Sequence, residues 1–188
     1  MSVYDDSYRI KEKRLFVATI TSINTSTHKG VQKIPVGNSP QTVIVQEGLK
    51  GDAHAGAWHR QVSFLAEESI AKAREMGLEV GPGDFAENFT TEGIDLLDLP
   101  LGTQLRLGDE VLVEISQIGK VCHTRCAIYH LAGDCIFPRE GIFAVVLEGG
   151  QVKAGDSIEL VKRGDGTTAY TPAEALAEVE AARRAGTL

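Results

Sequence analysis

Two segments in the second half of the chain alternate apolar and polar residues around short glycine turns. Residues 104–119 are interrupted by Gly108-Asp109, and residues 143–161 contain turns at Gly149-Gly150 and Gly155-Asp156. Alternation with a period of two places the apolar side chains on one face of a β-strand, and glycine beside aspartate favours a tight turn. These segments predict antiparallel hairpins and therefore a chain that is mainly β.

The rest of the chain predicts more short strands and two helices. Strands are expected over residues 15–24, 33–36 and 42–48, with a buried strand end at 63–66. A helix is expected over 67–76, where the period changes, and another from Thr171 as N-cap, with Pro172 at the first helical position, to Arg184. Residues 77–102 contain several glycines and two prolines and predict irregular structure.

This pattern predicts one β-barrel-like domain with a few peripheral helices. We expect an N-terminal arm at residues 1–14, the barrel domain at 15–162, and a C-terminal linker and helix at 163–188.

Charge and cysteine content exclude several classes of protein. The formal net charge is -7 and the pI is near 5.2, whereas proteins that bind nucleic acids or membrane surfaces need a basic face. The chain has no secretory signal and no apolar run near the roughly 18 residues of a membrane span. Three cysteines are an odd number, so a disulfide scaffold is disfavoured. We expect a cytoplasmic protein with reduced thiols and no nucleic-acid or membrane partner.

The three cysteines, Cys122, Cys126 and Cys135, have the spacing C-x3-C-x8-C. Structural zinc sites usually present two pairs of ligands, so this spacing is a weak metal signal. Cys126 and Cys135 are followed by apolar residues and fit a buried core.

Cys122 differs because Lys120, His123 and Arg125 lie within three residues of it. Nearby positive charge stabilises the thiolate, which is the nucleophilic and metal-binding form. If the predicted strand continued here, Lys120 and Cys122 would share a face and His123 would point away. Local chemistry leaves a reactive thiol and an inert one both open.

A glycine-rich loop at residues 48–61 carries Asp52, His54, His59 and Arg60. Glycines permit close backbone approach to a ligand, and this set of donors suits an anionic or oxygen-rich small molecule. A polar surface loop without a ligand is the alternative.

Two further polar groups are less specific. Asp84, Glu87 and Asn88 could coordinate a hard cation, hydrogen-bond a heterocycle, or tie a turn. Arg139, on the predicted turn at residues 138–141, could bind phosphate or carboxylate. Motifs of serine hydrolases, P-loop proteins, Rossmann enzymes and zinc proteases are missing from the sequence.

Five motifs then occur in order: GDAHAGAWHRQVSFLAEES, GDFAENFTTEGIDLLDLPLGTQLRLG, GKVCHTRC, GDCIFPREGIFAVVLEGG and VKAGDSIEL. Together they resemble the MOSC family, whose domains are similar to the C-terminal domain of molybdenum cofactor sulfurase. The resemblance covers roughly residues 15–162. Within the family, the chain is similar to the small stand-alone bacterial MOSC proteins. It implies a β-barrel related to that of pyruvate kinase, with peripheral α-helices.

The resemblance also implies a function. Cys122 matches the characteristic cysteine of the family, which is proposed to carry sulfur as a persulfide or to ligate molybdenum or tungsten. The expected ligand or substrate is the molybdenum cofactor, contacted by a set of polar residues: Asp52, His54, His59, Arg60, Lys120, His123, Arg125 and Arg139. Because no desulfurase domain is present, we expect no tightly bound pyridoxal phosphate in this chain.

The implied partners are a cysteine desulfurase, which uses pyridoxal phosphate, as the sulfur donor, and a molybdoenzyme or molybdopterin-biosynthesis protein. A homodimer is one expected assembly. Whether the chain is an enzyme, such as a sulfurtransferase, stays open. The alternatives are a non-catalytic module that binds and delivers molybdopterin, or a structural metal site formed by the thiolates of Cys122, Cys126 and Cys135 together with a histidine.

Overall fold

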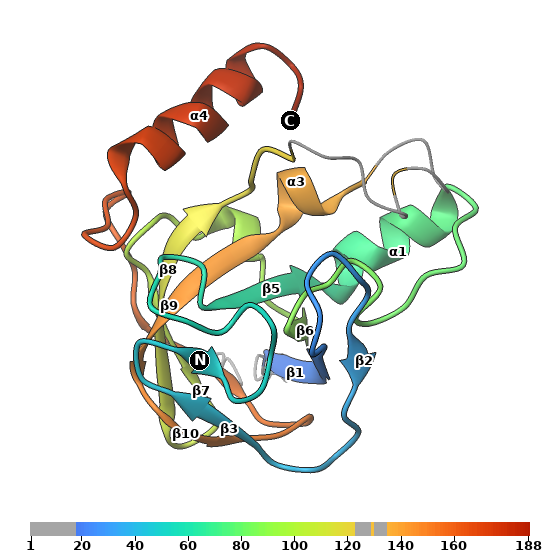
Figure 1. Ribbon diagram of the computed structural model, residues 1–188, viewed down its shortest axis with the longest axis vertical. Helices are drawn as coiled ribbons and strands as arrows, with labels where there is room; N and C mark the ends of the chain where they lie inside the picture. Colours follow the sequence, from blue (N-terminus) through green and yellow to red (C-terminus); the bar gives the residue numbers. More distant parts are fainter. Residues whose placement is uncertain (1–17, 123–128, 130–134) are drawn as a thin grey trace, which may run out of the picture.

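The structure is a computed structural model that describes residues 18–122, 129 and 135–188, and these residues are mainly β (Figure 1). The larger sheet runs, in spatial order, through β11 (Ile158–Lys162), β7 (Gln104–Leu107), β8 (Val111–Ile118), β9 (Ile142–Glu148), β5 (Val62–Ala66), β6 (Phe89–Glu92), β1 (Thr19–Thr25) and β2 (Ile34–Pro35). A smaller sheet contains β10 (Gly150–Val152), β3 (Gln41–Ile44) and β4 (Gly48–Leu49). The helices whose bounds lie in the described residues are α1 (Glu67–Glu75), α3 (Phe137–Glu140), α4 (Ala173–Arg184) and the short 3-10 helix η1 (Leu96–Asp98).

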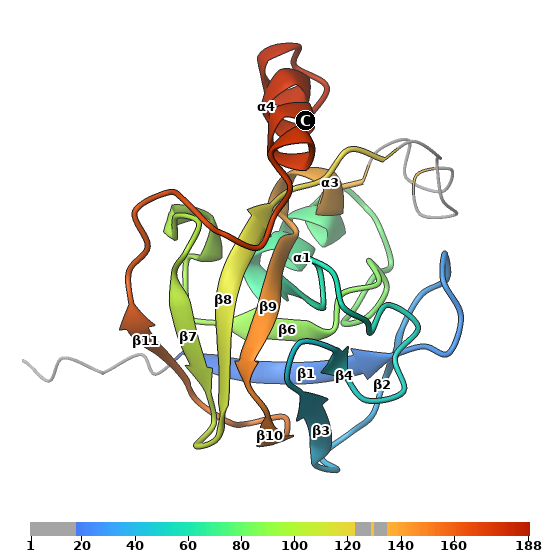
Figure 2. The same cartoon turned by 60° about the vertical axis from the view of Figure 1, so that its left-hand side comes forward.

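The larger sheet bends round until its two ends approach each other. Figure 2 shows β1 and β6 running across β7, β8 and β9. A single bridge joins Thr19 to Ser157, and Ile20 exchanges backbone hydrogen bonds of 2.9 and 2.7 Å with Asp156 and Gly155. No full strand ladder closes the sheet in the described part of the chain, so the expected barrel is an incompletely closed one.

One pair of strands is parallel, and a helix makes the connection. β5 pairs with β6 in parallel, and α1 lies between them in sequence. Parallel neighbours need a crossover, which a helix usually supplies. The predicted change of period after residue 66 is confirmed, since β5 ends at Ala66 and α1 begins at Glu67.

Two apolar clusters hold these elements together. The main core lies inside the curved sheet, where the rings of Phe64 and Phe89 stack with centroids 5.1 Å apart. The second cluster lies beneath α1 and α3, where Phe137 and Phe143 meet edge to face at 5.6 Å. Cys135 is half-buried against this second cluster, in agreement with a packing role for that thiol.

The hairpin predicted over residues 104–119 is confirmed as β7–β8. The strands predicted over residues 143–161 form as β9, β10 and β11, but the hairpin pairing predicted for them is wrong, because β10 pairs with β3, β11 with β7, and β9 with β8 and β5. The prediction of irregular structure over residues 77–102 is wrong for β6, a buried strand of sequence FTTE. The sequence did not indicate this strand, because its threonines are polar and give no alternation of apolar and polar residues. They are buried because β6 lies between β5 and β1 in the sheet. The predicted turn at residues 138–141 is wrong in detail, because Phe137–Glu140 form one helical turn with a proline near its N-terminus.

The C-terminal helix is confirmed as α4, but Thr171 is not its side-chain cap. The Thr171 hydroxyl instead donates to the carbonyl of Ser116 in β8, at 2.5 Å. No helix among the residues that the structure describes is both long and apolar enough to cross a membrane. The predicted arm at residues 1–14 lies outside the described residues.

Candidate functional site

Asp52 is the centre of the loop that joins β4 to β5. It is buried, and its Oδ1 accepts hydrogen bonds from Lys33 Nζ at 2.9 Å and from the His54 amide at 3.0 Å. Its Oδ2 accepts from the Ser26 amide at 3.2 Å. Burial opposes ionisation of Asp52, but the interactions with His54 and Lys33 outweigh it and hold the pKa well below its ordinary value. Both oxygens are thus engaged by the protein, and Asp52 positions the loop.

Lys33 is a residue that the sequence analysis missed. Its side chain is 0% exposed and faces Asp52 as a buried ion pair. Burial lowers the pKa of Lys33, while the charge and hydrogen bond of Asp52 oppose that shift. No local pattern marks this lysine, since it begins the short KIPV segment and its burial arises only when three separate loops meet over it.

The two histidines of the loop have ring nitrogens with no internal partner. His54 Nδ1 and His59 Nε2 are buried and find no hydrogen-bond partner among the described residues. His54 Nδ1 lies 3.7 Å from Asp52 Oδ1, which is too long for a hydrogen bond. Burial and the charge of Arg60 lower the pKa of His59, against an opposing interaction with Gln117. A lowered pKa favours the neutral imidazole of His59, which can donate or accept a hydrogen bond.

Arg60 is held between aromatic rings. Its guanidinium carbon lies 4.7 Å from the centroid of the Trp58 ring and 5.6 Å from that of Phe143. Burial lowers the pKa of Arg60, and the negative charges of Glu178 and of the Cys122 thiolate oppose the shift. Arg60 and Cys122, which are far apart in sequence, are thus electrostatic neighbours in the fold.

Cys122 is exposed and follows the end of β8. The strand does not continue to it, because β8 ends at Ile118 and Gly119 has a φ of 73°. A Cβ on Gly119 would lie 2.7 Å from the Pro138 carbonyl oxygen, so only glycine fits this turn. The predicted sharing of a strand face by Lys120 and Cys122 therefore does not apply.

Residues 119 and 120 are fastened to the α3 segment. Gly119 N donates to Gly141 O at 2.7 Å, and Lys120 N donates to Pro138 O at 2.9 Å. Lys120 Nζ lies 5.3 Å from the centroid of the Phe137 ring. Arg139 lies on α3 itself, in the segment that these bonds hold beside the chain leading to Cys122. His123, Arg125 and Cys126 lie outside the described residues.

The third polar group, at residues 84–88, serves the fold. The Glu87 carboxylate is buried and its Oε1 accepts from Gly83 N and from Thr90 Oγ1 at 2.5 and 2.8 Å. Asn88 Oδ1 accepts from the amide and hydroxyl of Ser63, and Asp84 Oδ2 accepts from Gly81 N. These bonds support the turn-tying alternative over a cation site.

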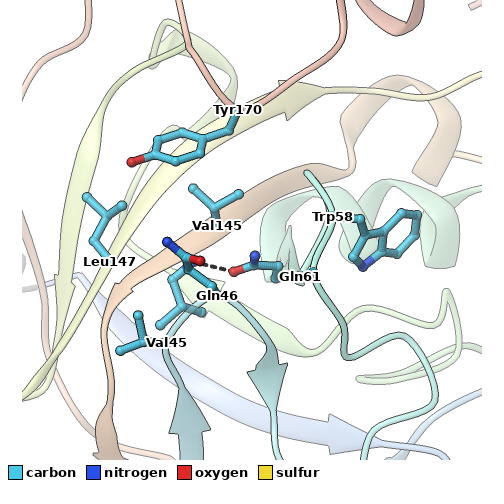
Figure 3. Close-up of a pocket in the computed structure, with 9 residues that line it drawn as sticks. Val45, Gln46, Trp58, Gln61, Val145, Leu147 and Tyr170 are labelled. Carbon is cyan, nitrogen blue, oxygen red and sulfur yellow. Dashed lines mark hydrogen bonds between the residues drawn. The ribbon is translucent and has the colours of Figure 1, made fainter.

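A cavity of about 400 Å³ adjoins this region, and Trp58 is the link, because its ring also stacks with Arg60. Figure 3 shows Trp58 and Tyr170 on opposite sides of the cavity, with the amides of Gln46 and Gln61 between them. Gln61 is held in place because its Oε1 accepts from Val146 N at 2.8 Å. The cavity thus pairs aromatic surface with amide groups.

A metal centre is not preformed in the described residues, where no group of three His, Cys, Asp or Glu side chains could hold an ion. The predicted structural site needs Cys126, which lies outside them, so it stays a prediction.

A family model described as the MOSC domain matches residues 51–159, which is more than half of the chain. The match includes Asp52, Arg60 and Cys122. None of the curated proteins matches this chain.

Solved structures match over most of the chain. YiiM from Geobacillus stearothermophilus is 25% identical, with a TM-score of 0.61 over 79% of this chain and 77% of that one. YiiM from Escherichia coli is 20% identical, with a TM-score of 0.62 over 90% and 94% of the two chains. YuaD from Bacillus subtilis is 18% identical, with a TM-score of 0.64 over 76% and 94%. The last two likenesses support the fold alone.

Proposed function

This chain belongs to the MOSC domain family, and on that basis we propose that it handles the molybdenum cofactor through Cys122. The family is associated with molybdenum cofactor sulfurase. The observation that carries the proposal is an exposed thiol, Cys122, which lies within the matched region and follows a turn that Gly119 and Lys120 fasten to the α3 segment. The thiolate is the form of cysteine that attacks sulfur or binds a metal.

The surrounding donors fit a pterin that bears phosphate and metal. The planar guanidinium of Arg60 suits phosphate oxygens, and its contact with Trp58 restricts its orientation. The buried ring nitrogens of His54 and His59 offer hydrogen bonds that the described residues leave unused. Lys120 adds a second positive charge on the segment leading to Cys122. These residues bind and orient, while the bound cofactor supplies the metal chemistry.

The proposed sulfur step needs a cysteine desulfurase as its partner. The Cys122 thiolate attacks the terminal sulfur of a persulfide carried by the desulfurase, and the S–S bond of that persulfide breaks. A new S–S bond forms on Cys122, and the desulfurase cysteine leaves as a thiolate. One sulfur atom changes carrier, so the step requires no external oxidant or reductant. The receiver is a molybdoenzyme or a protein that matures its cofactor.

Two alternative uses of the Cys122 site are distinguished by the experiments described below. Cys122 could ligate molybdenum or tungsten directly, since thiolates are soft ligands for metal ions. The site could also bind and deliver the cofactor without covalent sulfur chemistry. Each use makes a different demand on the thiol.

Persulfide formation is tested by mass spectrometry. The reduced protein is incubated with a cysteine desulfurase and cysteine, its thiols are blocked, and tryptic peptide 121–125 is analysed, which carries Cys122 as its only cysteine. We expect a gain of about 32 Da, one sulfur atom, on this peptide. Cys135→Ser is the matched control and keeps the gain, whereas Cys122→Ser loses it.

Metal and pterin content separate the other uses. In protein purified from its own host, metal ligation requires that Cys122→Ser lose molybdenum or tungsten. A delivery module requires that the variant keep both metal and pterin. If no sulfur is gained, and neither metal nor pterin is bound by the unaltered protein, the proposal is refuted.

A further inference from the structure

The backbone of His54 is fixed on both sides in the loop that joins β4 to β5. Its amide donates to Asp52 Oδ1 at 3.0 Å, and its carbonyl accepts from Trp58 Nε1 at 2.8 Å. The residue before it is fastened as well, because Ala53 N donates to Ser26 O at 2.7 Å. Since these bonds hold the backbone that carries the side chain, the imidazole ring has only its own torsions left to set its place.

The two nitrogens of the His54 ring have different surroundings. Nδ1 is buried, finds no hydrogen-bond partner among the described residues, and lies 3.7 Å from Asp52 Oδ1. The side chain as a whole is nevertheless 30% exposed. Nε2 is not buried in the same way, so it lies on the exposed edge of the ring while Nδ1 faces the carboxylate.

The charge on Asp52 decides which nitrogen of His54 carries the proton. A neutral imidazole has one N–H group and one lone pair. A lone pair on Nδ1 would be repelled by the carboxylate oxygen 3.7 Å away, whereas an N–H group in that position is attracted to it. Lys33 Nζ, 2.9 Å from the same oxygen, favours the ionised form of Asp52. The proton therefore belongs on Nδ1, and the lone pair on the accessible Nε2.

We propose that His54 is the proton acceptor of this loop and that Asp52 is its positioning residue. A reactant that arrives with an acidic proton on nitrogen or sulfur hydrogen-bonds to Nε2 and transfers that proton to it. The imidazolium formed in this way is stabilised by the Asp52 carboxylate, and the 3.7 Å separation closes to a hydrogen bond, as catalytic contacts tighten once a reactant is bound. The identity of the reactant rests on the proposed function, but the state of the ring in the resting protein does not.

The test reads the ring directly by ¹⁵N NMR of the resting protein, without desulfurase or cofactor, so that failure of the sulfur step leaves the measurement intact. The His54 signals are those that His54→Gln removes. At a pH where the ring is neutral, we expect a proton on Nδ1 and none on Nε2. Asp52→Asn removes the charge and should give a mixture of the two tautomers, while the ring of His28, an exposed histidine, is unchanged.

Diethyl pyrocarbonate measures whether the lone pair on Nε2 is available, because this reagent modifies unprotonated imidazole nitrogens and Nδ1 is buried. Tryptic peptide 51–60 carries both His54 and His59, so the modified residue is located by fragmentation. Asp52→Asn should slow the modification of His54 about twofold or more, because part of the population then carries its proton on Nε2. Modification of His28 is the matched control and should keep its rate.

Two results would overturn the inference. One is a neutral His54 ring that carries its proton on Nε2 in the unaltered protein. The other is a folded Asp52→Asn variant in which the tautomer of His54 and its rate of modification are both unchanged. If Asp52→Asn does not fold, the tautomer in the unaltered protein decides the question by itself.

Discussion

Replacing Lys33 with methionine removes the cation that faces Asp52 in the interior. The two side chains are 0% and 1% exposed, and the Nζ–Oδ1 distance is 2.9 Å. Removing one partner of a buried ion pair destabilises a protein by about 3–5 kcal/mol, because the other charge stays buried without compensation. The Asp52 carboxylate keeps two backbone donors, the amides of Ser26 and His54. We therefore expect a loss at the low end, about 3 kcal/mol.

The assay is urea unfolding at neutral pH, monitored by two probes so that two-state behaviour is checked. For a chain of this size the same loss lowers the melting temperature by about 6–12 °C. Lys50→Met is the matched control, an exposed lysine near the same loop, and its change should stay within about 0.5 kcal/mol. A loss below about 1 kcal/mol for Lys33→Met would refute the reasoning, since a buried unpaired carboxylate cannot be that well tolerated.

The pH dependence of the same variant has a defined sign. The pKa of Asp52 is depressed in the folded protein, so its contribution is present above the unfolded pKa of about 3.9 and is lost as pH falls through the folded pKa. Without Lys33 the pKa of Asp52 is lowered less, so the ionised Asp52 carboxylate contributes less to the stability of the variant. The difference in unfolding free energy between the two proteins should narrow as pH falls below about 4.

Two more changes test the surrounding loops. Burial raises the pKa of Glu87, so the stability that this side chain contributes is present below its unfolded pKa of about 4.3 and is lost as pH rises. Glu87→Gln stays neutral at every pH. The free energy of unfolding of this variant should therefore increase relative to that of the unaltered protein between acidic and neutral pH. Urea midpoints across that range measure this, and a difference independent of pH would contradict it. Gly83→Ala places a Cβ 2.2 Å from the Lys33 carbonyl oxygen, whereas Gly51→Ala, at a similar positive φ, meets nothing within 4 Å. Thermal unfolding should therefore show that Gly83→Ala is less stable than Gly51→Ala by about 2 kcal/mol or more. Equal losses of stability in the two variants would contradict a destabilising clash at residue 83.

Much of the strand pattern followed from local sequence. The β7–β8 hairpin and the change from β5 to α1 were predictable because their apolar spacing matches a single secondary structure. β6 was not predictable, because its threonines are buried only when β1 and β5 flank the strand. The closure of the sheet was overestimated, since one bridge between Thr19 and Ser157 depends on how far the whole sheet curves.

Some residues of the candidate site could likewise be predicted from the sequence, and others could not. Cys122 and Arg60 could be selected from the sequence as a basic-flanked thiol and a cation in a glycine-rich loop. Lys33 could not, because nothing near it in sequence indicates that it will be buried against Asp52. Glu87 and Asn88 were open to several uses until their hydrogen bonds to Gly83 and Ser63 assigned them to the fold.

Sequence alone determined that the chain is mainly β, that it resembles MOSC domains, and that one thiol has a basic neighbourhood, since each of these is written in short segments. Tertiary structure decided which distant segments surround the strand that leads to that thiol. The α3 segment is fastened to Gly119 and Lys120, and the C-terminal segment is fastened to β8 through Thr171 and Arg183. Electrostatic interaction depends on distance and burial, and neither is set until strands and helices from distant parts of the chain pack together.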